Sequence, residues 1–174
     1  YNEEEFVGDV IREMPAYVDR IYVIDDRSTD GTWGEILEAA RADASEHGSY
    51  DGTTVQQLVA DGGATALANR ATVRDTIGRV VPIEHRENRG AGGAIKTGYL
   101  AALADGVDAT VTVDADGQMD LSQLPRLLDP IVEGRADYAK GNRLLSREYR
   151  AAMPRFRFIG NATLTFLTKI ASGY

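Results

Sequence analysis

The stretch Thr110-Val111-Thr112-Val113-Asp114-Ala115-Asp116-Gly117-Gln118 decides how this chain is interpreted. Its first four residues are β-branched and predict a short strand. Two carboxylates and a side-chain amide follow at once, at Asp114, Asp116 and Gln118. In an open α/β sheet, ligands bind outside the carboxyl ends of the strands. We therefore expect these three side chains at the functional edge of the sheet.

Oxygen donors of this kind suit a hard cation, Mg²⁺ or Mn²⁺, which takes one or two protein carboxylates and completes its shell with water and phosphate oxygens. Asp114, Asp116 and Gln118 thus predict a metal that holds a diphosphate. The alternative for an isolated Asp-x-Asp is a solvated acidic turn. An EF-hand loop is excluded, because Met119 stands where its sharp turn needs glycine and Pro125 where its bidentate glutamate belongs.

Composition narrows the class of protein. The 174 residues suffice for one domain with a proper core, and the lack of cysteine excludes disulfides and thiolate metal sites. Acidic residues outnumber basic ones by 27 to 19, a net charge of −8 that argues against a nucleic-acid partner. Such an acidic, lysine-poor chain suits a halophile, and GC-rich coding bias is an equal alternative. No apolar run is long enough to span a membrane.

Hydrophobic periodicity predicts alternating helices and strands. Asn2 and Glu5 resemble a capping box before a helix over residues 3–14, and a preceding strand is expected to be missing from this sequence, which we interpret as a fragment. A continuous apolar strand, Ile21 to Ile24, ends in Asp25-Asp26. Further elements are expected as a helix from Trp33 to Ala40, a strand from Arg79 to Glu84, a helix from about Gly90 to Ala104, a helix from Leu124 to Ile131, and a strand from Tyr138 to Gly141.

Two segments are less regular. Residues 43–79 are polar and glycine-punctuated, and we expect a variable excursion with one short helix or hairpin. Pro82 predicts an edge position or an early end for its strand. The glycine-rich run from Gly90 to Gly98 nearly matches two phosphate-binding motifs and fits neither. Its small residues serve either close helix-sheet packing or a phosphate at the helix N-terminus.

The alternation of strands and helices predicts an α/β fold with a mostly parallel central sheet covered on both faces. The same topology is expected to bring four groups onto one rim of that sheet. They are residues 1–3, the Asp25-Asp26 pair, residues 114–118, and Arg143 after the last strand.

Five sequence blocks then give a specific resemblance. They are Tyr1-Asn2-Glu3-Glu4, Val23-Ile24-Asp25-Asp26-Arg27-Ser28-Thr29-Asp30-Gly31-Thr32, Asn88-Arg89-Gly90-Ala91-Gly92-Gly93-Ala94, Asp114-Ala115-Asp116-Gly117-Gln118 and Lys140-Gly141-Asn142-Arg143. In this order they resemble family 2 glycosyltransferases of the GT-A fold, and most of all the dolichol-phosphate mannose or glucose synthases and their polyprenyl-phosphate relatives. The resemblance implies a catalytic domain over residues 1–150.

The resemblance also implies roles, residue by residue. Tyr1, Glu3, Ile24 and Asp26 would line the nucleotide pocket. Asp114, Ala115 and Asp116 would lie at the ribose and diphosphate, with Asp114, Asp116 and Gln118 as metal ligands. Arg143 would serve a phosphate of the donor or acceptor, and the catalytic group would be Asp114, Asp116 and Arg143. Asp25 as a cap of the next turn, Glu3 as a helix-start residue and Arg143 as a surface ion-pair partner remain as structural alternatives.

These roles imply a metal-dependent, inverting transfer of a hexose from a nucleotide-diphosphate sugar to a polyprenyl or dolichyl phosphate. A lipid phosphate arrives ionised, whereas a hydroxyl acceptor needs a carboxylate base. A family 2 enzyme with a glycan acceptor and a non-catalytic nucleotide-sugar or Ca²⁺-binding module are the alternatives.

The C-terminal residues 151–174 predict an amphipathic helix. Its apolar face would carry Phe156, Ile159, Phe166, Leu167 and Ile170, with basic residues nearby. Such a helix lies either in a membrane interface or against a protein core. The resemblance favours the interface and thus the cytoplasmic face of the membrane. His47 and His85 have no metal-ligand spacing, and we interpret both as incidental.

Overall fold

The computed structural model describes residues 1–48, 55–60 and 64–141, together with the helical positions 160, 163, 164, 166, 167 and 170. Two compact units, Tyr1–Leu124 and Pro125–Tyr174, divide the chain and are described separately. The domain boundary predicted near residue 150 lies outside the described residues, as does Arg143.

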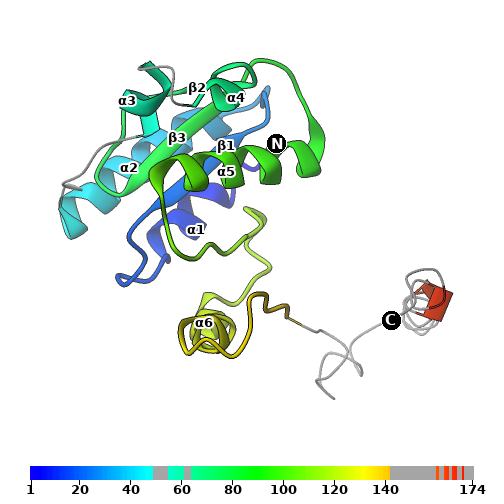
Figure 1. The fold of residues 1–174 in the computed structure, drawn as a ribbon. Helices are drawn as coiled ribbons and strands as arrows, with labels where there is room; N and C mark the ends of the chain where they lie inside the picture. The colour runs from blue at the N-terminus through cyan, green and yellow to red at the C-terminus, as the bar shows by residue number, and fades with distance from the viewer. Residues whose placement is uncertain are drawn as a thin grey trace. The chain divides into compact units, whose positions relative to one another are not determined.

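The first unit is a three-stranded sheet with helices on both faces (Figure 1). Strand β3 (Val80–His85) lies between β1 (Ile21–Asp25) and β2 (Ala71–Val73). β1 runs parallel to β3, and β2 runs antiparallel to it. The predicted α/β fold is confirmed, and the sheet is mixed rather than mostly parallel within the described residues.

Five α-helices lie among the described residues of this unit before the 3₁₀ turn, and two separate apolar clusters show how they cover the sheet. One cluster joins Ile21 and Val80 to the apolar residues of the first two helices, and the other joins Val81 and Ile83 to residues of the remaining three. The helices are α1 (Val7–Arg12), α2 (Thr32–His47), α3 (Val55–Ala60), α4 (Thr65–Ala68) and α5 (Gly90–Asp105).

The two-residue period of a strand explains which β3 residues face which group of helices. Val80 belongs to the cluster with α1 and α2, whereas Val81 and Ile83 belong to the cluster with α3, α4 and α5. The same alternation places the next odd-numbered residue, His85, on the α5 face. The alternation of the preceding apolar residues thus determines the face of the sheet to which the polar side chains at the ends of β1 and β3 point.

Pro82 is in the central strand, so its predicted edge position is wrong. Its carbonyl accepts the N–H of Arg74 at 3.0 Å, and its partner on β1 is Val23. N–H and C=O of one strand residue point to the same side, so the missing N–H of Pro82 faces β2 rather than β1. β2 ends at Val73, one residue before Arg74, the residue that lies opposite Pro82. The proline is tolerated because the β2–β3 ladder ends before it would need the N–H that proline lacks.

Two predicted strands are not formed. Residues 110–113 and 138–141 have no strand assignment. Thr110, Val111 and Thr112 are exposed, and the run has no ladder partner in the part of the chain that is described. β-Branched residues favour a strand only where neighbouring strands and a core face receive them.

The predicted excursion over residues 43–79 contains the end of α2, the short helices α3 and α4, and the antiparallel strand β2. The helix predicted from Leu124 to Ile131 is confirmed as α6 (Leu124–Val132), which follows a 3₁₀ turn (Leu121–Gln123). Asp120 caps that turn by accepting the N–H of Ser122 at 3.0 Å.

The predicted first helix is shorter than expected. Helix α1 spans only Val7–Arg12, and Asn2 does not cap it. The Asn2 side chain instead accepts the N–H of Thr29 at 2.9 Å. A tertiary partner has therefore replaced the local capping box. Residues 2–6, which include a turn at residues 4–6, form an entry segment at the carboxyl end of β1.

Candidate functional site

The entry segment is bound to the loop that follows β1. Asn2 donates its N–H to Ser28 Oγ at 2.9 Å, and Glu3 donates its N–H to Thr32 Oγ1 at 2.8 Å. Asn2 has a φ of +56°, a left-handed conformation that asparagine adopts more readily than most residues. Residues 1–4 and the loop after β1 are thus brought together, as the sequence predicts.

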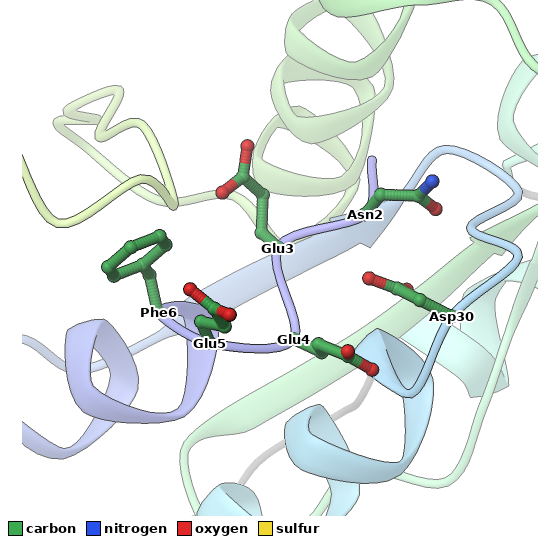
Figure 2. A pocket seen from close by; sticks show the side chains of 6 residues that line it. All are labelled: Asn2, Glu3, Glu4, Glu5, Phe6 and Asp30. Atoms are coloured by element: carbon green, nitrogen blue, oxygen red, sulfur yellow. The ribbon is translucent and has the colours of Figure 1, made fainter.

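Between these two segments lies an open, acidic pocket of about 150 Å³. Figure 2 shows Glu3 and Glu4 leaving the entry segment on opposite sides, with Asp30 directed toward it from the loop. Glu4 accepts the N–H of Gly31 at 2.6 Å, so its carboxylate is used by the loop. The Thr32 hydroxyl and backbone hydrogen bonds lower the pKa of Asp30, which keeps it charged. Of the predicted site residues, Glu3 lines this pocket.

Asp25 and Asp26 point to different faces of the sheet, as consecutive strand residues must. The Asp25 carboxylate accepts the N–H and the hydroxyl of Ser28. This contact matches the structural alternative for Asp25, a cap of the turn. Asp26 accepts the N–H of Arg89 at 2.7 Å and contacts His85 Nδ1 at 2.6 Å, both through Oδ1. Asp26 therefore connects β1 to the loop before α5.

The environment of Asp26 keeps it ionised. Burial on its own would raise the pKa of this carboxyl group, but hydrogen bonds from His85 and from the backbone N–H groups of Arg89 and Gly90 outweigh it and lower the pKa below the ordinary value. The side chain is 5% exposed. Asp26 is thus a nearly buried, fixed anion at the carboxyl end of the sheet.

His85 is the residue that sequence reasoning missed. It is fully buried and contacts both Asp26 and Thr97, and it is not incidental to the structure. Its signal was a polar residue two positions after Ile83 and four after Val81, on the same buried face of a strand. The other histidine, His47, is exposed at the end of α2, and its Nδ1 lies 3.2 Å from Asp43 Oδ1.

The Asp-x-Asp turn lies beside the entry segment. A side chain at Gly117 would come within 3.5 Å of Phe6, and Gly117 has a φ of +67°. Val113 and Ala115 pack against the core that contains Val7 and Ile11, so the turn is anchored from beneath. The entry segment, the loop after β1 and the Asp-x-Asp turn are therefore neighbours at one end of the sheet.

The metal-ligand set predicted in this turn remains accessible. Asp114 and Gln118 are exposed and Asp116 is half-buried, while Asp116 Oδ1 accepts the N–H of Gln118 at 3.0 Å. Two carboxylates and one amide oxygen suit a hard cation that keeps water and diphosphate oxygens as its other ligands. No group of three His, Cys, Asp or Glu side chains gathers within metal-binding reach among the described residues. The oxygen donors of Asp114, Asp116 and Gln118 therefore fit such a cation by their chemistry.

The other predicted site residues are placed differently. Tyr1 is 55% exposed, and Ile24 packs its side chain toward α5. A Cβ on Gly98 would lie 3.3 Å from Ile24 Cδ1, so one glycine of the glycine-rich run does allow close helix-sheet packing. Gly90, in contrast, has a φ of +69° and faces open space.

Helix α5 is held at two points, one near its middle and one at its C-terminus. Near its C-terminus, Asp105 accepts hydrogen bonds from Arg20 Nε at 2.9 Å and from the Tyr22 hydroxyl at 2.6 Å. In its first half, Thr97 meets His85. The position of Asn88 and Arg89 relative to Asp26 is therefore set by the sheet.

Comparison with known proteins gives a consistent result. The model of glycosyl transferase family 2 matches residues 53–171. A UDP-N-acetylglucosamine–dolichyl-phosphate N-acetylglucosaminyltransferase of Methanococcus voltae is 27% identical over the whole of this chain, which spans 61% of that protein. An uncharacterized protein of Methanocaldococcus jannaschii is 35% identical over 95 residues, 55% of this chain and 39% of its own length. No solved structure matches significantly. With the family model covering more than half of its residues, the chain belongs to glycosyltransferase family 2, and the predicted GT-A fold class is confirmed.

Proposed function

We propose that the protein transfers a hexose, or a derivative such as an N-acetylhexosamine, from a nucleotide-diphosphate sugar to a polyprenyl or dolichyl phosphate at the cytoplasmic face of the membrane. The observation that carries the proposal is the similarity over the whole chain to a relative named for dolichyl-phosphate N-acetylglucosaminyl transfer. The neighbouring entry segment, loop after β1 and Asp-x-Asp turn support it.

The donor nucleotide is proposed to bind across the ends of the sheet. Asp26 offers an ionised carboxylate that can accept an N–H of the base or a ribose hydroxyl, and Glu3 lines the acidic pocket of the entry segment. Asp114, Asp116 and Gln118 supply oxygen ligands at the diphosphate end. Arg143 is proposed to pair with a phosphate, because its guanidinium can donate two parallel hydrogen bonds to it.

Charge accounts for the proposed reaction. Breaking the bond between the sugar C1 and the diphosphate leaves negative charge on the departing phosphate. A divalent ion held by Asp114, Asp116 and Gln118 would supply Lewis-acid neutralisation of that charge. An ionised lipid phosphate needs no general base, so a single displacement with inversion at C1 is the expected course. The protein's part is to orient donor and acceptor and to exclude water.

The membrane part of the proposal rests on the C-terminal residues. The described positions there are helical, and Leu164, Phe166, Leu167 and Ile170 are each more than half exposed. An apolar helix face of this kind can lie in the boundary between headgroups and acyl chains. Among the described residues, no helix is long and apolar enough to cross a bilayer.

The test uses the full-length protein. Purified protein is incubated with UDP-N-acetylglucosamine and with other UDP- and GDP-sugars, with Mn²⁺ or Mg²⁺ or neither, and with dolichyl phosphate. We expect one donor to give a glycosyl-phospholipid only when metal is present, and NMR of the product to show an inverted anomeric centre. Transfer to a saccharide with none to dolichyl phosphate would overturn the acceptor assignment.

A further inference from the structure

A buried histidine connects the candidate nucleotide-binding carboxylate to the interior. His85 has no exposed surface, and its two ring nitrogens have separate partners. Nδ1 lies 2.6 Å from Asp26 Oδ1, and Nε2 lies 2.7 Å from Thr97 Oγ1. Asp26, His85 and Thr97 thus form a continuous chain from the end of β1, through the end of β3, to the middle of α5.

The direction of the first hydrogen bond follows from charge. An ionised carboxylate can only accept, so the Nδ1–H of His85 donates to Asp26. Burying an imidazole without partners would be costly, and the polar contacts at both nitrogens remove that cost. The chain is therefore a satisfied polar network inside an apolar layer that contains Val81 and Ile83.

Thr97 holds the far end of this network. Its Oγ1 is 3.0 Å from the carbonyl of Gly93 in the preceding turn of α5, and Arg70 Nε donates to the same oxygen at 3.3 Å. The imidazole thus has a fixed support on α5 and cannot rotate without breaking the contact with Thr97. A fixed ring in turn fixes the direction in which Nδ1–H points.

At the near end, Asp26 is held from two sides. Oδ1 accepts both the His85 imidazole and the N–H of Arg89, while the backbone carbonyl of Asp26 accepts Asn88 Nδ2 at 3.0 Å. The contacts with His85 and Arg89 both fall on Oδ1, and the Gly90 N–H is a further hydrogen-bond donor to the carboxylate. In the proposal, Oδ2 is the oxygen that meets the ligand. The orientation of that oxygen depends on the group that holds its twin.

We propose that His85 is a positioning residue for donor binding, which orients the Asp26 carboxylate through Nδ1–H so that Asp26 accepts a hydrogen bond from the nucleoside. The inference rests on the proposed function, because it needs a nucleotide at Asp26. His85 itself touches no substrate. Its contribution falls on nucleotide affinity rather than on the chemical step.

A matched pair of substitutions separates positioning from packing. In His85→Asn, the amide nitrogen lies near the place of Nδ1 and can still donate to Asp26. In His85→Gln, the longer side chain places its amide near Nε2, keeping the contact with Thr97 and losing the one with Asp26. Both changes bury an uncharged amide of similar polarity, so a scaffold role would make the two variants alike.

The experiment measures binding of UDP and of GDP, each with Mn²⁺, to the full-length protein by calorimetry. For the nucleotide that binds, we expect His85→Gln to weaken affinity about ten- to hundredfold, the range for loss of a hydrogen bond to a charged group. His85→Asn should stay within about threefold of the unsubstituted protein. The donor KM should follow the same order, with kcat changed less. His47→Gln, at the other histidine, is the control and should leave affinity unchanged.

Asp26→Asn shows whether the effect passes through Asp26. In that background, His85→Gln should add no further loss of affinity, because the oriented carboxylate is already gone. Equal losses in His85→Asn and His85→Gln, or an undiminished loss in the Asp26→Asn background, would overturn the positioning role and leave the proposed function intact. Binding of neither nucleotide by the unsubstituted protein would overturn both.

Discussion

Arg79 and Asp43 form a buried ion pair in which Arg79 Nη2 lies 2.8 Å from Asp43 Oδ1. The same guanidinium donates to the carbonyls of Met14, Pro15 and Val18 in the segment that links α1 to β1. One side chain thus joins α2, the start of β3 and the chain segment before β1. Both side chains of the ion pair are buried. Removing either Arg79 or Asp43 therefore leaves the other charge buried without its counter-ion.

Replacing Asp43 by Ala should therefore lower the free energy of unfolding by about 3–5 kcal/mol, the range for breaking a buried pair from one side. Urea unfolding measures it. Asp9→Ala, which breaks the exposed pair of Asp9 with Arg12 at 2.9 Å, is the matched control and should cost about 1 kcal/mol or less. Similar losses for the two variants would show that Arg79 finds other compensation.

The Asp-x-Asp turn offers a second comparison. Asp116→Asn should keep the turn, since an amide oxygen can still accept the Gln118 N–H, but it should lower metal-dependent transfer at least about a hundredfold, a loss of the size seen when charge stabilisation is removed. Asp120→Asn, four residues further on, changes the cap of the 3₁₀ turn and should leave transfer nearly unchanged. Initial rates at saturating donor and Mn²⁺ provide the measurement. A pair of equally active variants would contradict the metal assignment.

Two glycines at the start of α5 should respond in opposite ways to alanine. Gly90 has a φ of +69°, so Gly90→Ala forces a left-handed alanine and should destabilise the protein by about 1–2 kcal/mol. At Gly92 no atom lies within 4 Å of an added Cβ and φ is not positive, so Gly92→Ala should stabilise by roughly 0.5–1 kcal/mol. Thermal unfolding of both variants measures this, and equal signs would contradict the assigned backbone.

The pH dependence of stability should report on Asp26. Because its pKa is lower in the folded than in the unfolded chain, the unfolded state binds more protons at acidic pH. Its contribution to stability is therefore present above about pH 4 and is lost as pH falls through the folded pKa. The difference in unfolding free energy between the unsubstituted protein and Asp26→Asn should shrink from pH 6 to pH 3. A difference that does not vary with pH would show that the carboxylate is not stabilised by its contacts.

The exposed apolar residues of the C-terminal part should govern membrane affinity. Replacing Phe166 and Leu167 together by Ser removes two large side chains that are 64% and 54% exposed. Flotation of the full-length protein with vesicles of anionic and neutral phospholipid should show at least about tenfold weaker binding, since burial of each side chain contributes on the order of 1.5–3 kcal/mol. Replacing the exposed Leu103 on α5 is the control. Unchanged flotation would place this face against protein instead.

The sequence was sufficient where apolar residues repeat with a clear period. Strand β1 and helix α2 lie as expected, because Ile21 to Ile24 form an unbroken apolar run and Ile36 and Ala40 share a helix face. The Asp-x-Asp turn and the loop after β1 were recognisable from their motifs. Patterns of this kind involve residues close together in the sequence, so they can be predicted without knowledge of tertiary contacts.

The remaining features depend on partners distant in the chain. Asn2 was expected to cap α1, yet Thr29, 27 residues away, supplies its N–H instead. The role of His85 cannot be predicted from its neighbours in the sequence, since its partners Asp26 and Thr97 lie on other elements. Thr110 to Val113 has strand propensity without a ladder partner in the described structure. Each case was decided by tertiary contacts, which periodicity does not encode.

Pro82 in the central strand also limits how β2 and β3 can combine during folding. Sliding β2 along β3 by two residues would bring the imino nitrogen of Pro82 opposite a carbonyl that needs a donor, and would move Val73 away from Ile83. Misaligned pairing of β2 with β3 is thereby disfavoured. The proline thus favours a single register between β2 and β3. That register is the one that pairs His85 with Ala71 at the end of the sheet.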